Sequence, residues 1–301
     1  MKIALCQLNF IVGDIEGNVS KIIDSYQRSV ADQADLAVFS ELSICGYPPQ
    51  DLLDYPHFID KCRQALLQLA EITGDTAMLV GCPMFSELAE GKKLYNTAAF
   101  LWQGQIKEVI VKTLLPTYNI FDEYRYFEPN IEFKLIEFKG LKLAVTICED
   151  IWNLGDNPLY LVCPMDKLME HKPDVMINLS ASPFDYTHDE DRKAAVKANV
   201  LKYRIPMFYC NAVGSQTEIV FDGTSLVFDK QAYLCGQLDS FWEELKSFIL
   251  HDDGTINAPV IETADKIAGQ ELNPVMLDEG LNMEHVYEAL LMGIKDYFSK
   301  M

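Results

Sequence analysis

Leu-Lys-Leu-Ala-Val-Thr-Ile-Cys-Glu-Asp-Ile-Trp, residues 141–152, is the most informative stretch of this sequence. Its apolar, β-branched part predicts a buried strand over 141–147, and the strand stops at a thiol followed by two carboxylates. A strand that turns at once lifts the side chain of Cys148 out of the sheet, where a substrate can reach it. We expect the N–H groups of the next turn to lower the pKa of this thiol and to bind an oxyanion. A buried structural cysteine is the alternative that this stretch alone leaves open.

The composition describes a large folded protein. The 301 residues are 49% hydrophobic and 23% charged, which argues against disorder. A formal net charge of −20 argues against binding to nucleic acid or to an anionic membrane. The eight cysteines and five histidines show no metal-ligand spacing, so we expect no metal site. Without a signal peptide or an apolar run long enough for a membrane span, the sequence predicts a cytoplasmic protein with reduced thiols.

Hydrophobic periodicity predicts an α/β protein with a mixed sheet. An ordered loop is expected over 116–129, where aromatic and polar residues follow no clear period. Helices are expected at Val19–Val30, 57–73, 158–171 and 189–203. Strands are expected at 2–9, 35–40, 76–82, 95–102, 106–112, 132–138, 141–147, 174–180, 206–212 and 224–229.

The character of the sequence changes near residue 250. Residues 1–250 are expected to form one domain, and the Gly, Pro, Asn and Asp residues within 251–282 predict a linker. The segment 283–301 then carries a single helix over 283–299. Its apolar stripe needs a partner, which is either the main domain or the beginning of a further domain. The stripe consists of Val286, Leu290, Ile294 and Tyr297, with Leu291 and Phe298 beside it.

Two other segments also place a reactive side chain where an apolar run ends. Glu41 ends the run 35–40, and a half-buried carboxylate there can act as a general base with a raised pKa. Lys112 ends a second run and can stabilise negative charge on a reacting carbonyl oxygen. Taken singly, Glu41 can be a solvated carboxylate and Lys112 a lysine that protects an edge strand. Together with Cys148 they predict a base, an oxyanion-binding group and a nucleophile.

The contexts of these three residues resemble the carbon–nitrogen hydrolase (nitrilase) superfamily. Within it they most resemble the amino-terminal glutaminase domain of glutamine-dependent NAD+ synthetase. The motifs are Glu41 before Gly-Tyr-Pro-Pro, Lys112 before Leu-Pro-x-Tyr, Ile-Cys-Glu-Asp-Ile-Trp around Cys148, and Asn-Leu-Ser-Ala-Ser-Pro at 178–183. The resemblance covers roughly residues 1–250 and implies a four-layer αββα sandwich.

The resemblance also implies a role for ten residues. Four are catalytic: Glu41 as general base, Lys112 as the oxyanion-binding lysine, Cys148 as nucleophile and Glu123 as a second, assisting glutamate. Six are expected to bind glutamine. Glu149 is expected to bind the α-ammonium group of glutamine, and Ser180, Ser182 and Arg192 its carboxylate. Tyr47 and Tyr118 are expected to line the pocket.

The family's synthetase domain has no counterpart in residues 1–301, where its Ser-Gly-Gly-x-Asp-Ser loop does not occur. The resemblance implies that ATP, Mg2+ and deamido-NAD+ bind only at that absent C-terminal domain, and that the glutaminase domain needs no cofactor. It further implies that 283–301 is the first helix of the absent or truncated synthetase domain in a longer parent chain. Glutamine is the expected partner of this chain, and a homo-oligomer is expected by analogy alone.

Three hypotheses follow from these residues. In the first, glutamine forms a γ-glutamyl thioester on Cys148, ammonia leaves, and water activated by Glu41 releases glutamate. The second is a free-standing amidase or nitrilase that acts on another small amide. The third is a catalytically silent interaction module that keeps only the sandwich.

Overall fold

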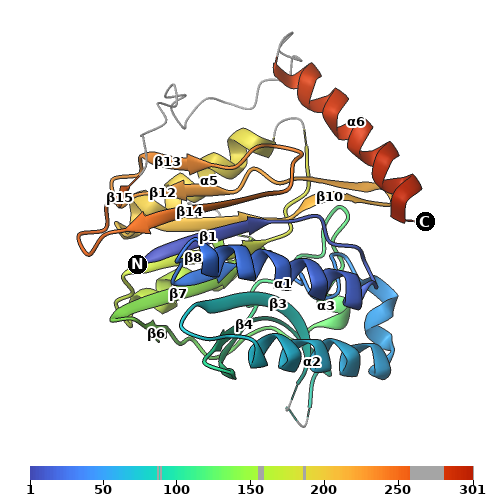
Figure 1. The fold of residues 1–301 in the computed structure, drawn as a ribbon, viewed down its shortest axis with the longest axis horizontal. Helices are drawn as coiled ribbons and strands as arrows, with labels where there is room; N and C mark the ends of the chain where they lie inside the picture. The colour runs from blue at the N-terminus through green and yellow to red at the C-terminus, as the bar shows by residue number, and fades with distance from the viewer. Residues whose placement is uncertain (87, 89, 155–158, 186–187, 258–280, 301) are drawn as a thin grey trace.

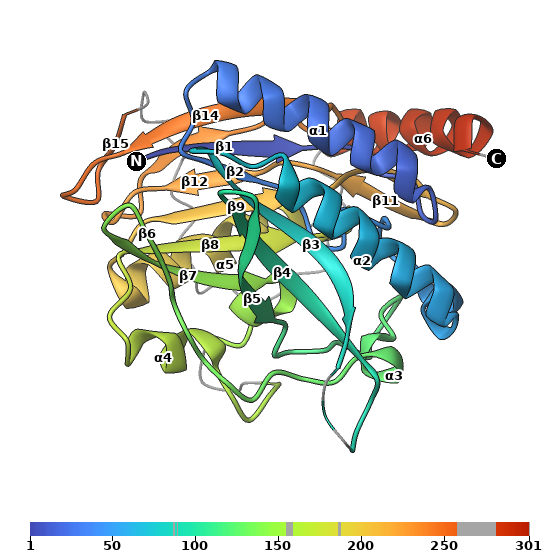
Figure 2. The same cartoon turned by 60° about the horizontal axis from the view of Figure 1, so that its bottom comes forward.

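A computed structural model of the chain describes residues 1–301 except 87, 89, 155–158, 186–187, 258–280 and 301. Two β-sheets pack face to face, and helices cover the outer face of each sheet (Figures 1 and 2). The prediction of a four-layer αββα sandwich is confirmed. Instead of the one mixed sheet that periodicity suggested, the described residues form two large sheets and a separate two-stranded one.

The first sheet has seven strands in the order β15-β14-β1-β2-β3-β4-β5. Its centre is parallel, and its two sides are completed by antiparallel pairing. Helices α1 (Ile15–Ala31) and α2 (Pro56–Glu71) lie side by side over it (Figure 1). The strands are β1 (Lys2–Gln7), β2 (Leu36–Val38), β3 (Ala77–Phe85), β4 (Leu94–Trp102), β5 (Gln105–Val111), β14 (Glu244–Leu250) and β15 (Ile256–Asn257).

The second sheet has six strands in the order β13-β12-β9-β8-β7-β6, with a parallel centre of β7, β8 and β9. Helices α4 (Pro164–Met169) and α5 (His188–Tyr203) cover it (Figure 2). Its strands are β6 (Ile136–Phe138), β7 (Leu141–Ile147), β8 (Val175–Ser180), β9 (Met207–Asn211), β12 (Leu226–Phe228) and β13 (Leu234–Gln237). The smaller elements are the hairpin of β10 (Val213–Gln216) and β11 (Ile219–Asp222), the short helix α3 (Glu123–Tyr126), and the 3₁₀-helices η1 (Gln50–Asp54) and η2 (Cys148–Ile151).

Strand β7 shows why its sequence predicts a strand so clearly. Leu143, Val145 and Ile147 alternate into the core between the two sheets, while Ala144 faces the layer under α4 and α5. Because both faces of the strand are covered, it is an almost continuous apolar run. Its observed bounds are the predicted ones.

Two elements were predicted with the wrong bounds, and some strands were not predicted at all. The helix expected over 158–171 begins only at Pro164, because proline suits the first helical turn and cannot donate an N–H further inside a helix. The strand expected over 132–138 is reduced to β6. Strand β14 was not predicted. It pairs with β1, with Lys2 opposite Ile249, and a partner so remote in sequence leaves no local pattern.

Helix α6 (Leu281–Lys300) packs on the β10–β11 hairpin (Figure 1). Asp296 Oδ2 accepts the N–H of Ser215 at 2.7 Å, and Lys300 Nζ donates to the carbonyl of Ser215 at 2.7 Å. The helix therefore contacts the main domain, one of the two expected alternatives. It does so through a partly polar face, while the expected apolar stripe stays largely exposed, as at Leu290, Ile294, Leu291, Tyr297 and Phe298.

The predicted linker falls mostly on 258–280, which lie outside the described residues. None of the helices in the described part of the chain is long and apolar enough to cross a membrane.

Candidate active site

The predicted base, lysine and nucleophile follow three strands whose carboxyl ends meet. Glu41 follows β2, Lys112 follows β5 and Cys148 follows β7. The first two come from one sheet and the third from the other, so the site lies where the edges of both sheets converge. Ligands of open α/β sheets commonly bind outside the carboxyl ends of strands.

Lys112 lies between two glutamates. Its Nζ is 2.7 Å from Glu41 Oε1 and 2.7 Å from Glu123 Oε1, and all three side chains are buried. Neutral groups donate further hydrogen bonds to both carboxylates, among them the N–H of Ala181 to Glu41 Oε2 at 3.2 Å. Asn96 Nδ2 donates to Glu41 Oε1 at 2.7 Å, and the Tyr47 hydroxyl donates to Glu123 Oε1 at 2.8 Å. A fully buried ammonium thus faces two fully or nearly buried carboxylates.

The cluster favours the charged form of Lys112 but not that of Glu123. Burial alone would lower the pKa of Lys112, but the carboxylates of Glu123 and Glu41 raise it well above its ordinary value, so the amine stays protonated. Burial raises the pKa of Glu123 to about 7, against the opposing effect of Lys112 and with a further increase from Glu41. One ammonium cannot fully compensate two carboxylates, and a proton is therefore held more tightly here than in water.

Cys148 occupies a strained turn. Its φ is +42°, in the left-handed region that is unfavourable for a residue with a side chain, directly between β7 and η2. Its side chain lines a cavity of about 470 Å³, a size suited to a small-molecule substrate. The turn therefore presents the thiol to the cavity, as the sequence predicts.

The expected low pKa of Cys148 was wrong. Burial raises the pKa of this thiol well above its ordinary value, and the carboxylates of Glu41, Glu123 and Glu149 raise it further, while Lys112 acts in the opposite direction. The resting group is a thiol, and it needs a base before it can attack.

Three of the six expected binding residues line the cavity beside Cys148: Tyr118, Glu149 and Ser182. Glu149 Oε2 accepts the Tyr118 hydroxyl at 2.8 Å, and Oε1 accepts the Tyr160 hydroxyl at 3.1 Å. Burial raises the pKa of Glu149, and the Tyr118 hydrogen bond and the charge of Lys112 counteract it. Two more acidic residues, Asp185 and Glu218, also line the cavity.

The other three expected binding residues lie elsewhere. Tyr47 is bonded to Glu123, as described above. Ser180 is fully buried and donates its hydroxyl to Asn178 Oδ1 at 2.6 Å. Arg192 is fully buried, with its two terminal nitrogens each 2.8 Å from one oxygen of Asp222. Arg192 is not among the residues that line the cavity of Cys148, and its bidentate partner Asp222 neutralises its charge.

Three residues that contribute to the site were not singled out from the sequence. Asn96 bonds to Glu41, Tyr160 bonds to Glu149, and Asp150 accepts backbone N–H groups from two segments. Asn96 lies inside the apolar run of β4, where a single buried amide was a usable signal. Tyr160 carries no such signal. In the described residues, no group of three or more His, Cys, Asp or Glu side chains is arranged to hold a metal ion.

Several known proteins with similar sequences carry the same name. Glutamine-dependent NAD(+) synthetase from Synechocystis sp. is 34% identical over 305 residues, which cover 99% of this chain and 52% of that protein. The protein of the same name from Thermotoga maritima is 31% identical over 318 residues, covering 100% of this chain and 54% of that protein. The chain spans about half the length of these curated relatives.

Solved structures agree with this similarity. The glutamine-dependent NAD+ synthetase from Acinetobacter baumannii, in complex with ADP, superposes with a TM-score of 0.85 at 30% identity, covering 99% of this chain and 52% of that chain. An amidase from Nesterenkonia sp. AN1 has the same fold, with a TM-score of 0.69 at 22% identity over 84% of this chain and 94% of that chain. Residues 2–249 match the family described as carbon-nitrogen hydrolase, and the chain therefore belongs to that family.

Proposed function

We propose that this chain hydrolyses glutamine to glutamate and ammonia. The observation that carries the proposal is the pairing of a strained, cavity-lining Cys148 with the buried Glu41–Lys112 ion pair at 2.7 Å. A thiol with a raised pKa needs a neighbouring base, and a carbonyl under attack needs a fixed positive charge. The cluster supplies a candidate for each.

The proposed reaction has two halves. Glu41 takes the proton of the Cys148 thiol as sulfur attacks the carboxamide carbon, and Lys112 stabilises the negative oxygen of the tetrahedral intermediate. The C–N bond breaks, Glu41 returns the proton to the leaving nitrogen, and ammonia departs from a γ-glutamyl thioester. Water then gives a proton to Glu41 and attacks the thioester. The C–S bond breaks, the thiol regains its proton, and glutamate is released.

Glutamine recognition is assigned to the acidic wall of the cavity. Glu149 can accept hydrogen bonds from the α-ammonium group of glutamine, because the hydroxyls of Tyr118 and Tyr160 orient its carboxylate. Ser182 lines the same cavity and is the candidate hydrogen-bond donor to the α-carboxylate. The Glu149→Gln variant should raise KM for glutamine by about tenfold or more, the effect of losing a charged hydrogen bond. It should not change KM for 4-carbamoylbutanoate, which has no α-amino group.

We further propose that a longer parent chain uses the ammonia to make NAD+ from deamido-NAD+ and ATP. The support is the name of the relatives, which are about twice as long as this chain. The same comparison favours glutamine over other small amides as the substrate. ATP, Mg2+ and deamido-NAD+ would bind to the additional domain and not to residues 1–250.

Ammonia release from glutamine tests the proposal. The wild-type chain should release ammonia, and Cys148→Ala should reduce the rate to that of a blank. Cys163→Ala is the control, because Cys163 is a half-buried cysteine at the start of α4 and lies outside the cavity. Equal rates for wild type and Cys148→Ala would end the proposal. Faster hydrolysis of a simple aliphatic amide than of glutamine would instead support the amidase alternative.

A further inference from the structure

The carboxylate of Asp150 joins the two segments that carry the lysine and the nucleophile. Its Oδ1 accepts the N–H of Thr113 at 3.1 Å and that of Leu114 at 2.8 Å, immediately after Lys112. Its Oδ2 accepts the N–H of Ile147 at 3.0 Å, immediately before Cys148. Each oxygen therefore holds one segment, and the 3% exposed side chain connects them away from solvent.

The connection crosses between the sheets. Thr113 and Leu114 follow β5 of the seven-stranded sheet, whereas Ile147 ends β7 of the six-stranded sheet. The backbone of Lys112 is also bonded to Asn96, but that bond stays within the first sheet. Asp150 is thus a direct hydrogen-bonded link between the strand end that carries Lys112 and the turn that carries Cys148.

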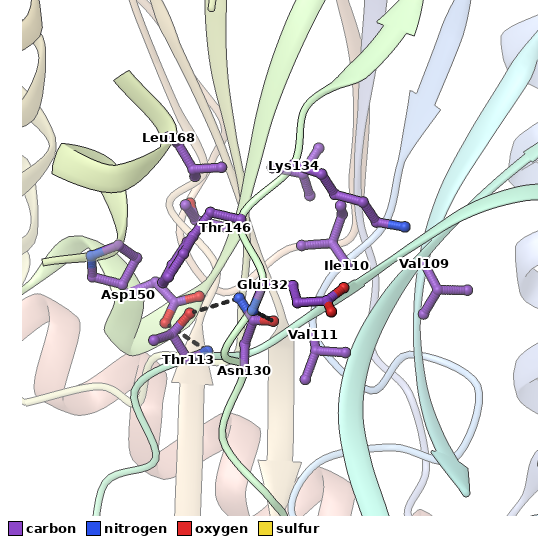
Figure 3. A pocket seen from close by; sticks show the side chains of 13 residues that line it. Val109, Ile110, Val111, Thr113, Asn130, Glu132, Lys134, Thr146, Asp150 and Leu168 are labelled. Atoms are coloured by element: carbon purple, nitrogen blue, oxygen red, sulfur yellow. Dashed lines mark hydrogen bonds between the residues drawn. The ribbon is translucent and has the colours of Figure 1, made fainter. Parts of the chain in front are cut away.

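Packing around this junction is incomplete on one side. A cavity of about 110 Å³ opens beside it, and Val111, Thr113, Thr146 and Asp150 are among its lining residues. Figure 3 shows Asp150 and Thr113 facing each other at the edge of this cavity. Side chains that border a void lose part of the contacts that would otherwise fix them. Hydrogen bonds to the carboxylate therefore carry more of the constraint here than they would in a filled core.

We propose that Asp150 is a positioning residue that fixes the Lys112 ammonium and the Cys148 sulfur relative to each other. The kinetic part of this inference rests on the proposed function. Asp150 is not among the residues that line the cavity of Cys148; it acts through the backbone next to Lys112 and Cys148. A displacement of ~1 Å between reacting groups lowers rates by about a hundredfold, so loss of this link should lower the catalytic rate.

The Asp150→Asn variant can keep the hydrogen bonds to only one of the two segments. An asparagine has one acceptor oxygen and one donor nitrogen, so it can accept from Thr113 and Leu114 or from Ile147, but not from both. The side-chain volume is unchanged, and no new void is made. We expect kcat for glutamine to fall by about 10- to 100-fold. KM should stay within about threefold of wild type, because the residues that line the substrate cavity are untouched.

Alkylation of Cys148 by iodoacetamide gives a readout that does not depend on glutamine. Peptide mapping by mass spectrometry distinguishes Cys148 from the other cysteines. We expect Asp150→Asn to slow alkylation of Cys148 at least about tenfold, since the thiol reacts only when its neighbours are in place. If wild type does not hydrolyse glutamine, the proposed function fails, and the alkylation rates still decide the role of Asp150.

Asp229→Asn is the matched control. Asp229 is also a buried aspartate whose Oδ1 accepts two backbone N–H groups, those of Gln231 and Tyr233, each at 2.9 Å. It lies between β12 and β13, away from the cavity. The control should keep both kcat and the alkylation rate of Cys148. Unchanged rates in folded Asp150→Asn, or equal losses in the two variants, would overturn the proposal.

Hydrogen exchange of the wild-type chain tests the link even if Asp150→Asn does not fold. The N–H groups of Thr113 and Leu114 lie beyond the end of β5, where amides without a partner exchange fast. The proposal requires them to be protected to the same degree as the N–H of Ile147, since all three share one buried acceptor. Rapid exchange at Thr113 and Leu114 would show that the link is not formed in solution.

Discussion

Lys112 Nζ and Glu41 Oε1 lie 2.7 Å apart in a solvent-excluded ion pair, although 71 residues separate them in the sequence. The same ammonium is shared with Glu123. This sharing has a consequence for the proposed reaction. When Glu41 takes a proton from Cys148 it loses its charge, its attraction for Lys112 weakens, and the ammonium becomes more available to the developing oxyanion.

Glu41→Gln should leave the chain folded and slow the reaction strongly. The amide keeps the shape of the side chain but cannot accept the thiol proton, and Lys112 retains its ion pair with Glu123. Loss of a positioned base costs about 10²- to 10⁴-fold in rate. Ammonia release measures kcat, and circular dichroism checks the fold. Glu108→Gln, which removes a carboxylate from an exposed pair with Lys134, should be neutral; a Glu41→Gln enzyme with more than a tenth of wild-type kcat contradicts the assignment.

Lys112→Met should destabilise the fold. It leaves Glu41 and Glu123 as buried neighbours without a cation, and breaking a buried pair in this way costs about 3–5 kcal/mol. The loss should be smaller at pH 5 than at pH 8, because the carboxyls can then take up protons. Urea unfolding at both pH values measures it. Lys134→Met is the matched control, as its exposed pair contributes about 1 kcal/mol or less; similar losses in both variants would refute a buried charge cluster.

The unfolding free energy of wild type should fall as the pH rises from about 5 to about 7. Burial raises the pKa of Glu123 and of Asp150 to about 7, well above the ordinary carboxyl range. Between that range and pH 7 the folded state binds more protons than the unfolded state, so raising the pH favours unfolding. Above both folded pKa values this contribution becomes constant.

Urea unfolding at half-unit pH intervals measures this slope. The Glu123→Gln variant should have a shallower slope, because one of the contributing carboxyls is gone. A wild-type stability that increases between pH 5 and pH 7 would rule out the raised pKa values of these two groups.

Arg192→Met should lower stability without weakening glutamine binding. Removal of the guanidinium leaves the carboxylate of Asp222 buried without its bidentate partner, at a cost of about 3–5 kcal/mol. KM for glutamine, measured below the unfolding temperature, should stay near wild type. The comparison with Glu149→Gln is decisive, since that variant should raise KM with little loss of stability. A large increase in KM for folded Arg192→Met would restore Arg192 as a binding residue.

Local sequence patterns were sufficient to locate the reactive residues along the chain. The run Leu141–Ile147 is apolar because both of its faces are covered, and such a run ends where the backbone leaves the sheet. Cys148, Lys112 and Glu41 could therefore be placed at strand ends from local pattern alone. Strands and long helices were identified for the same reason, since their side-chain period is a local property.

Which of these groups face one another became evident only from the folded structure. Arg192 and Ser180 have the right chemistry for a substrate carboxylate, but the fold gives each of them a protein partner. The pKa of Cys148 is raised instead of lowered, because folding removes water from the thiol and places the carboxylates of Glu41 and Glu123 near it. Hydrogen bonds, ion pairs and desolvation depend on distances between residues that are remote in sequence, and local periodicity does not predict those distances.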